Sequence, residues 1–223
     1  MIIVHHLNNS RSQRVLWLLE ELGADYEIQH YERDKKTMLA PPQLRAVHPL
    51  GKSPVITDGD VTVAETGAII EYIIDHYDGG RLRPASGTAE GRQFTYWLHY
   101  AEGSIMPLMV MTLVFRRVET APMPFFVKPV ARAIVGKVRN GYLGPNIKTH
   151  LDFMEVEVGN TGWFAGDKFS AADIQMSFPV EAAKARGGLD GRPNLAAFLD
   201  RIHTRPAYQR ALERGGPYQL LGG

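Results

Sequence analysis

The adjacent residues Glu65 and Thr66 stand where an alternating apolar stretch gives way to helical spacing. The first turn of a helix has unpaired N–H groups and the positive end of the helix dipole, and both attract a carboxylate. The Thr66 hydroxyl could donate to the same carboxylate, while Glu65 could pair with an ammonium group. The pair therefore suits the headgroup of an α-amino acid, which carries both charges. The structural alternative is helix capping, with Thr66 as the N-cap and Glu65 as a solvated acid.

A second feature, the dipeptide Ser53–Pro54, precedes a short apolar strand that begins at Val55. Proline cannot donate a hydrogen bond to a neighbouring strand, so it suits the first residue of a strand. An X-Pro bond can be cis at modest cost, and a cis bond here would turn the Ser53 backbone outward. The exposed N–H and C=O could then pair with an extended peptide, as in strand addition. The alternative is a trans proline that merely begins a strand.

Ser10 lies in the polar loop that follows the first apolar stretch. In the segment SRSQ it could be the N-cap of the next helix, in a capping box with Gln13. Alternatively, its hydroxyl could donate a hydrogen bond to a bound thiolate, helped by the helix N-terminus and by Arg11 and Arg14. A thiol pKa lowered from about 8.5 towards about 6–7 would make most of the thiol nucleophilic at neutral pH. Three other residues of the loop could act in its place: Asn8, Asn9 and Ser12.

Metal-dependent and cysteine-dependent chemistry finds little support in this sequence. The chain contains no cysteine, which excludes disulfides, thiolate metal sites and a mechanism that uses the protein's own thiol. His5 and His6 are neighbours in a predicted strand, so their side chains point to opposite faces and cannot readily share a metal. We therefore predict a protein that uses no metal.

Two further patterns have both a functional and a structural interpretation. Methionine and aromatic residues with helical spacing could line an apolar pocket, although such a stripe also suits core packing. The segment SAAD, Ser170 to Asp173, has the pattern of a capping box at a helix start, and we interpret it as structural. The residues of this stripe are Met106, Met109, Met111 and Phe115.

The elements that must position these residues alternate between strand and helix in the first part of the chain. A strand, a helix ending at Gly23 and a second strand are followed by a hairpin with an Asp-Gly turn and another helix. This order indicates a thioredoxin-like arrangement. The connection between residues 34 and 53 is irregular and has room for one short helix. The predicted strands are Ile2–His6, Asp25–Glu32, Val55–Ile56 and Thr62–Ala64; the predicted helices are Ser12–Gly23 and Gly67–Tyr77, the latter with Ile69, Ile70, Ile73, Ile74 and Tyr77 on one face.

The second part of the chain has almost no strand signal. A segment rich in glycine and proline, DGGRLRPASGT, interrupts the periodic pattern and indicates a linker. We therefore predict a thioredoxin-like domain over residues 1–78, a linker over 79–87 and an all-helical domain over 88–223. The predicted helices are Ala89–Glu119, Phe125–Asn140, Asn146–Val158, Ala171–Ala185, Leu195–Thr204 and Ala207–Arg214.

Composition and charge set limits on partners and location. With 44% hydrophobic and 22% charged residues among 223, the chain reads as a soluble globular protein with a well-buried core. The net charge is +1 and no basic run is long enough to suggest a nucleic-acid surface. The start, MIIVHHLNNS, has no charged leader before an apolar core, and the most apolar stretch, SIMPLMVMTLVF, is too short to cross a bilayer and contains Pro107. We expect a cytoplasmic protein without nucleic-acid or membrane partners.

Considered together, these features resemble the soluble glutathione transferases. The resemblance covers nearly the whole chain: a thioredoxin-like first domain, a short linker and an all-helical second domain. It is nearest to bacterial and fungal members of a theta-like, serine type that share the SRSQRVLWLLEELG kind of start. The order and spacing of three segments are specific to the family: NNSRSQRVLWLLEELG, HPLGKSPVITDGDVTVAETGAIIEYI and WFAGDKFSAADI.

The resemblance implies that glutathione is a co-substrate and that no metal is needed. In this family the proline before the third strand is cis, and the backbone of the preceding residue, here Ser53, pairs with the cysteinyl part of glutathione. The acid–hydroxyl pair, here Glu65 and Thr66, holds the γ-glutamyl headgroup. Lys52 and His48 would face the glycine carboxylate. The expected glutathione-binding residues are therefore His48, Lys52, Ser53, Pro54, Glu65 and Thr66.

For the reaction, the resemblance places Ser10 at the position of the activating serine. The glutathione thiolate would attack a hydrophobic electrophile in a pocket of the second domain. The box Ser170–Asp173 would stabilise the fold, and a homodimer is expected. The chain departs from the family pattern in using Glu–Thr where Glu–Ser or Asp–Ser is commoner, and no tyrosine stands at the end of the first strand. The pocket residues expected to contact the electrophile are Tyr100, Met106 and Met109.

Two other functions remain open from the sequence. A glutathione-dependent peroxidase or isomerase would share the thiolate activation and differ only in the electrophile. A non-catalytic relative would use the same fold to bind a protein partner. The intact Ser53–Pro54 and Glu65–Thr66 pairs argue for an enzyme, and we predict a glutathione transferase.

Overall fold

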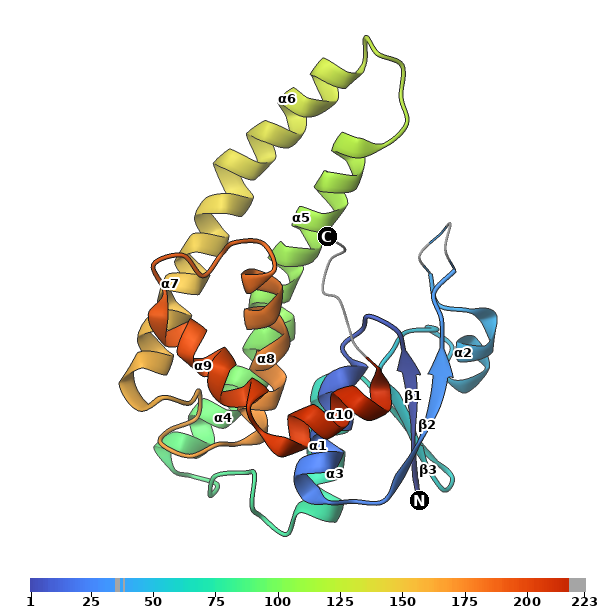
Figure 1. Cartoon of the computed structure of the whole chain (residues 1–223), viewed down its shortest axis with the longest axis vertical. Coiled ribbons are helices and arrows are strands. Elements are labelled where there is room, and N and C mark those ends of the chain that lie inside the picture. Colours follow the sequence, from blue (N-terminus) through green and yellow to red (C-terminus); the bar gives the residue numbers. More distant parts are fainter. Residues whose placement is uncertain (35–36, 38, 217–223) are drawn as a thin grey trace.

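The computed structural model describes residues 1–34, 37 and 39–216 of the chain. Its first part contains a four-stranded sheet in the order β2-β1-β3-β4, in which β1 pairs in parallel with β2 and β3 pairs antiparallel with both β1 and β4. Helices α1 and α3 lie between this sheet and the helical second part (Figure 1). The predicted thioredoxin-like arrangement is thus confirmed. Its elements are β1 (Ile2–Leu7), α1 (Ser12–Leu22), β2 (Tyr26–Tyr31), α2 (Pro42–Val47), β3 (Val55–Asp58), β4 (Val61–Ala64) and α3 (Thr66–Ile73).

Helix α1 follows the predicted pattern closely. Val15, Leu18 and Leu19 are fully buried, as expected for an apolar stripe that faces a core. Gly23 ends the helix in a left-handed conformation, with φ +65°, and its N–H reaches the carbonyls of Glu20 and Leu19. Glycine adopts this conformation without a steric penalty, which explains why the helix ends there.

The face predicted for the next helix is correct at four positions and wrong at Tyr77. Ile69, Ile70, Ile73 and Ile74 are buried, whereas Tyr77 is 39% exposed and its hydroxyl donates to Asp58. The α-helix ends at Ile73 and continues as one turn of π-helix over Ile74–Asp78. A π-helical turn holds more residues than an α-helical turn, so it rotates the following side chains off the buried face.

The second part is helical, as predicted. Apart from an isolated bridge between Trp163 and Gly166, the described residues after Ala64 form no strand. The predicted domain limits at 78 and 88 remain predictions; residues 79–88 contain no helix or strand, and residues 217–223 of the predicted second domain lie outside the described residues. The helices are α4 (Ala89–Tyr100), α5 (Met106–Thr120), α6 (Lys128–Val138), α7 (Gly144–Thr161), α8 (Ala171–Lys184), α9 (Pro193–His203) and α10 (Pro206–Gly215).

The capping box predicted at the start of α8 is present. Ser170 flanks the helix, and Asp173 accepts hydrogen bonds from the backbone N–H groups of Ser170 and Phe164, each at 2.8 Å. Asp173 is fully buried, so these donors compensate for the water that its carboxylate loses. The box therefore anchors the helix that packs against α1 and α4.

The last described helix, α10, returns to the first part of the molecule. It packs against α1, and Arg210 and Arg214 both bind the Glu20 carboxylate, at 2.7 and 3.1 Å. Arg205, just before α10, binds Glu21 at 2.6 Å. One contiguous apolar core runs through both parts of the chain, so the two parts are packed together rather than tethered.

Helices α5 and α6, with the connection Ala121–Val127 between them, form an arm that projects from the rest of the molecule (Figure 1). One turn of π-helix joins α4 to α5, giving a continuous helix of 32 residues, Ala89–Thr120. The apolar stretch judged too short to cross a membrane is therefore part of a longer helix. This helix is long enough to span a bilayer, and its most apolar 18-residue window has a mean hydropathy of 1.3, although 39% of that window is buried inside the protein. The helix predicted to begin at Phe125 begins at Lys128, where Pro129 suits the first turn.

Candidate functional site

Three of the predicted motifs lie at one edge of the sheet. His5 pairs with Val55, and Val55 pairs with Ala64, so the end of β1, the start of β3 and the end of β4 are neighbours. Ser53–Pro54 leads into β3 from this edge, and Glu65–Thr66 follows β4 at the same edge. The loop after β1 carries Ser10 there as well. The sheet register thus brings together residues from three separate stretches of sequence.

Ser53 is bound to β1 through its side chain and open through its backbone. Its hydroxyl donates to the carbonyl of His5 at 3.0 Å and accepts the Leu7 N–H at 3.4 Å. The Ser53–Pro54 peptide bond is cis. The Ser53 backbone N–H and C=O have no hydrogen-bond partner among the described residues. Such free backbone groups beside a strand can accept an extended peptide.

Ser10 is buried and its oxygen has three polar neighbours. It lies 2.7 Å from the Ser12 hydroxyl, 3.2 Å from the Ser12 N–H and 3.4 Å from the Ser53 hydroxyl. By accepting the Ser12 N–H it closes a local turn, but α1 begins at Ser12 and is flanked by Arg11 with no side-chain cap, so the prediction that Ser10 is the N-cap is wrong. The Gln13 half of the predicted capping box is also wrong. The Gln13 amide lies against Gly215 of α10 and has no hydrogen-bond partner among the described residues, because the packing of α10 directs it away from the loop.

The hydroxyl of Ser12 extends this contact to a buried imidazole. Ser12 Oγ lies 2.8 Å from His6 Nδ1, with the Leu7 carbonyl a more distant acceptor at 3.5 Å. Burial, aided by the neighbouring His30, lowers the pKa of His6 to about 4, although a hydrogen bond to the backbone of Gly215 opposes this shift. His6 is therefore neutral at physiological pH. His5 has other partners, Tyr31 and Thr57, as expected for the opposite face of the strand.

The direction of these hydrogen bonds follows from the tautomer of His6, which we assign from its neighbours. Nδ1 faces Ser12 and Gly215 is the backbone neighbour of the ring, so we place the hydrogen on Nε2. Nδ1 then accepts from the Ser12 hydroxyl, and the Ser12 oxygen accepts from Ser10. In this arrangement the Ser10 hydrogen points towards Ser12. We call the chain Ser10–Ser12–His6 the hydroxyl–histidine chain.

A buried arginine connects the site to the helical part. Arg14 donates to Glu102 at 2.5 Å, to the carbonyl of Gln175 at 2.6 Å and to the Thr66 hydroxyl at 3.4 Å. Arg11 lies 3.5 Å from the same carboxylate. Burial raises the pKa of Glu102, but the charges of Arg14 and Arg11 outweigh it and hold the pKa below its ordinary value. Glu102 therefore neutralises much of the positive charge of Arg11 and Arg14, which the sequence analysis had expected to help stabilise a thiolate.

Glu65 and Thr66 differ from the capping interpretation. The helix begins at Thr66, and Glu65 is the residue that flanks it, so Thr66 is not the N-cap. Thr66 is buried and accepts a hydrogen bond from Arg14, while Glu65 is exposed. Glu65 has φ +72°, a conformation that costs a residue with a side chain about 1–3 kcal/mol and is concentrated at ligand-binding positions. This backbone conformation leaves the Glu65 carboxylate exposed at the helix start.

The two residues predicted for the glycine carboxylate lie near Ser53 in sequence but are not connected to it. Lys52 is exposed and His48 is partly exposed. Neither the Lys52 ammonium nor the His48 ring has a hydrogen-bond partner among the described residues. Both side chains are therefore free to meet a negative charge.

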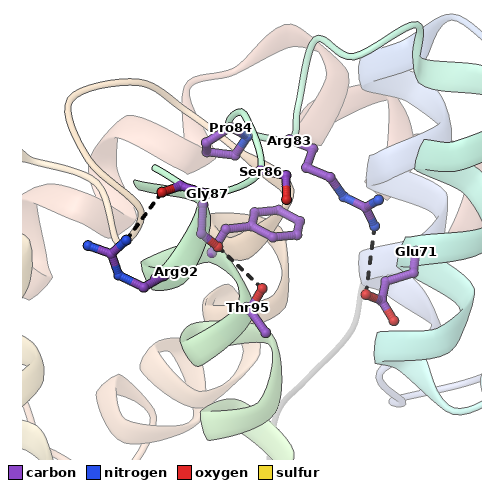
Figure 2. A pocket seen from close by; sticks show the side chains of 9 residues that line it. Glu71, Arg83, Pro84, Ser86, Gly87, Arg92 and Thr95 are labelled. Atoms are coloured by element: carbon purple, nitrogen blue, oxygen red, sulfur yellow. Dashed lines mark hydrogen bonds and ion pairs between the residues drawn. The ribbon is translucent and has the colours of Figure 1, made fainter. Parts of the chain in front are cut away.

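The residues predicted to contact an electrophile are deeply packed. Tyr100, Met106 and Met109 are at most 6% exposed, and the Tyr100 hydroxyl is hydrogen-bonded to His150. Met109 also lines a cavity of about 190 Å³ together with Leu143, Leu151 and other residues of the helical part. A second, larger pocket of about 440 Å³ lies at the linker, where Arg83 is paired with Glu71 (Figure 2). Arg83 also binds Asp75, at 2.6 Å. This pocket contains none of the predicted site residues.

Two participants in the site were missed from the sequence, Glu102 and His6. Glu102 is an isolated acid in the largely apolar segment that leads into α5, and this isolation was a signal that it has a buried partner. His6 was considered only as a metal ligand. Its contact with Ser12 depends on how the loop after β1 turns back, which residue spacing does not reveal. No group of described residues is arranged to hold a metal ion.

Comparisons with known proteins match both parts of the chain. The glutathione S-transferase N-terminal domain model matches residues 1–75, and the C-terminal domain model matches residues 143–206. Glutathione S-transferase 1 of Saccharomyces cerevisiae is 34% identical, covering 96% of this chain and 95% of its own length. Glutathione S-transferase 3 of Schizosaccharomyces pombe is 36% identical, covering 96% and 88%. The crystal structure of a glutathione S-transferase from Actinobacillus pleuropneumoniae superposes with a TM-score of 0.75 at 33% identity, covering 99% of this chain and 95% of that one.

Proposed function

The chain belongs to the glutathione S-transferase family, and from this we propose that it is a glutathione transferase of the serine type. It binds glutathione as a co-substrate and joins the glutathione sulfur to an electrophilic atom. The thiolate supplies both electrons of the new bond, and the leaving group or the polarised acceptor takes up the displaced pair. No protein nucleophile takes part, so the rate enhancement comes from thiolate stabilisation and positioning.

The observation that carries this proposal is the meeting of an open backbone and an acid–hydroxyl pair at one sheet edge. The free N–H and C=O of Ser53 bind the cysteinyl part of an extended glutathione. The γ-glutamyl headgroup reaches the end of β4, where its ammonium meets Glu65 and its carboxylate meets Thr66 and the N-terminus of α3. Lys52 and His48 face the glycine carboxylate. The sulfur then lies beside Ser53, within reach of Ser10.

Ser10 stabilises the thiolate by turning its hydroxyl hydrogen from Ser12 to the sulfur. In the absence of a thiolate, this hydrogen is directed to the Ser12 oxygen, 2.7 Å away. The Ser12 N–H, at 3.2 Å, continues to donate to the Ser10 oxygen after the turn and strengthens Ser10 as a donor. The pKa of the bound thiol falls because the hydrogen bond forms only with the charged sulfur.

Ser10→Ala is the direct test. We expect turnover to fall by about tenfold or more through a thiol pKa raised by about one unit. The pKa is measured from the pH dependence of thiolate absorbance in the enzyme–glutathione complex and from the pH–rate profile. Ser86→Ala, at the linker, is the matched control. A thiol pKa that is equal in Ser10→Ala and the parent enzyme would show that Ser10 only supports the turn before α1.

The electrophile is assigned to the helical part, against Tyr100, Met106 and Met109. The cavity beside Met109 supports an apolar substrate, whereas the burial of Tyr100 and Met106 suits the packing role that the sequence left open. A panel of halo-aromatics, unsaturated carbonyls and hydroperoxides, assayed with glutathione, separates transferase from peroxidase chemistry. A protein that is not stabilised against thermal unfolding by millimolar glutathione would instead be a non-catalytic binder.

We also propose that two copies associate and that the dimer is cytoplasmic, as is usual for this family. The exposed side chains of Tyr96, Phe153 and Val156 gather on α4 and α7, where the rings of Tyr96 and Phe153 are 6.3 Å apart, and they offer an apolar contact surface. Light scattering should give about twice the 24.9 kDa mass of the chain. Val156→Glu should lower that mass, and a parent protein that is already monomeric contradicts the dimer.

A further inference from the structure

The connection at the end of the arm contains the two most exposed aromatic residues of the part of the chain that the structure describes. Phe125 is 83% exposed and Phe126 is 67% exposed, and both belong to the segment that joins α5 to α6 (Figure 1). Valine and isoleucine side chains on the adjoining turns are also exposed: Val118, Val127, Val130 and Ile134, at 37–58%. We call these six residues the arm tip. A group of this size on a projecting element indicates a surface that is covered by a partner.

The arm also carries an excess of positive charge. Residues 106–138 contain five Lys or Arg residues and one Glu, a net charge of +4 on a chain whose total is +1. The single acid, Glu119, is paired with Arg139 at 3.6 Å. Lys128 and Arg132, beside the arm tip, are exposed and have no ion-pair partner among the described residues. Apolar side chains flanked by unpaired cations are the pattern that recognises an anionic lipid surface.

The geometry favours an arm that lies on a membrane over a helix that crosses one. The helix Ala89–Thr120 is long enough to span a bilayer, but Trp97, Ile105 and Met109 on it are buried in the core. A spanning arrangement would remove these residues from the core. The arm tip can enter the outer few ångströms of a bilayer without disturbing any buried contact.

The arm lies apart from the parts of the chain that match the family models. Those models cover residues 1–75 and 143–206, so the whole connection between α5 and α6 falls between them. The hydroxyl–histidine chain, Ser53 and Glu65–Thr66 are all outside the arm. Contact of the arm tip with a surface therefore leaves the glutathione site intact.

We propose that the arm tip binds a membrane surface rich in anionic lipid, with Phe125 and Phe126 inserted among the acyl chains and Lys128 and Arg132 against the headgroups. This brings the enzyme to a place where apolar electrophiles accumulate. The inference revises the expectation of a protein without a membrane partner. It is independent of the proposed reaction, because binding to vesicles is measured without glutathione or an electrophile.

Vesicle flotation of the full chain tests the proposal. We expect binding to vesicles of phosphatidylcholine with phosphatidylserine, little binding to phosphatidylcholine alone, and release by added salt. The double variant Phe125→Ser/Phe126→Ser and the double variant Lys128→Glu/Arg132→Glu should each bind at least about tenfold more weakly. Leu39→Ser, which alters an exposed apolar residue away from the arm, should bind like the parent. Glutathione transferase activity towards a soluble electrophile should be unchanged in all three.

A second measurement keeps the proposal testable if a double variant folds poorly. In a Phe126→Trp variant, tryptophan emission should shift to shorter wavelength on addition of anionic vesicles and not with neutral ones. No binding of the parent chain to anionic vesicles at low salt overturns the proposal. Binding of Phe125→Ser/Phe126→Ser that equals binding of the parent chain would also overturn the proposal. If this variant differs from the parent in oligomeric mass while its vesicle binding is unaltered, the arm tip is instead an interface between proteins.

Discussion

The sheet edge and the arm tip differ in how far their side chains are paired within the protein. At the sheet edge most of the hydroxyls and charged groups have an internal partner, and the groups left open to a ligand include the Ser53 backbone, the Glu65 carboxylate and the Lys52 ammonium. At the arm tip, apolar groups and cations alike are left to the solvent. The comparison teaches two ways to recognise a binding surface. A site for a small polar ligand is indicated by the few polar groups that have no partner within the protein, whereas a docking surface is indicated by apolar side chains and cations that the fold leaves exposed.

The largest expected contrast between the two regions comes from removing one arginine from each. Arg14→Met leaves Glu102 and the Gln175 carbonyl without their main donor in a buried setting, and should lower the free energy of unfolding by about 2–4 kcal/mol. Arg132→Met, on the arm, should change it by less than about 0.5 kcal/mol. Urea denaturation measures both. Equal losses would mean that the arm is as tightly integrated as the site.

The next contrast is a dependence on pH that belongs to the sheet edge alone. The unfolded chain protonates His6 near pH 6.5, whereas the folded chain does so only near pH 4, so the unfolded state binds more protons in between. The free energy of unfolding should therefore fall as the pH drops from 6.5 to 4, by about 1.4 kcal/mol for each pKa unit.

The matched variants for this pH dependence are His6→Asn and His99→Asn. His6→Asn should flatten the acid side of the stability profile, measured by urea denaturation across the range. His99→Asn, exposed on α4, should leave the profile unchanged. An unchanged profile in His6→Asn would show that the buried imidazole is not the group responsible.

A smaller effect concerns the backbone at Glu65. Glycine adopts a positive φ without strain, so Glu65→Gly should be more stable than Glu65→Ala by about 1 kcal/mol although both lack the carboxylate. Both should bind glutathione more weakly, as measured by calorimetry. Equal thermal stability of the two variants would show that the conformation at residue 65 is not strained.

The smallest expected effect concerns the hydroxyl–histidine chain, where two serine-to-alanine variants should shift the pKa of the bound thiol in opposite directions. Ser12→Ala removes the acceptor that holds the Ser10 hydrogen, so the pKa of the bound thiol should fall slightly, whereas Ser10→Ala should raise it. Thiolate absorbance as a function of pH measures both. A higher thiol pKa in Ser12→Ala would show that Ser10 does not turn away from Ser12 on binding.

Local signals in the sequence were sufficient for most of the fold. Gly23 stops α1, the Asp58–Gly59 turn forms the β3–β4 hairpin, and the Ser170–Asp173 box starts α8, because each signal acts within a few residues. The sequence also indicated which motifs meet at the sheet edge, through the resemblance of their order and spacing to a family. The roles of individual residues there remain predictions.

What the sequence did not indicate depends on contacts between distant segments. Glu102 neutralises Arg14 across 88 positions, and Gly215 of α10 lies against His6 and Gln13 from the far end of the chain. The segment around Phe125 was predicted to be part of a helix, and its apolar residues would suit a core equally well. Their exposure is decided by the projection of the arm, which is a property of the whole fold.

The bond between Gly215 and His6 has a consequence for the order of biosynthesis. The imidazole that faces the Ser12 hydroxyl gains its contact with Gly215 only when α10 is made, so the hydroxyls of the sheet edge can reach their final arrangement only near the end of translation. Full catalytic competence should therefore appear in a single late step, after α10 has packed against α1.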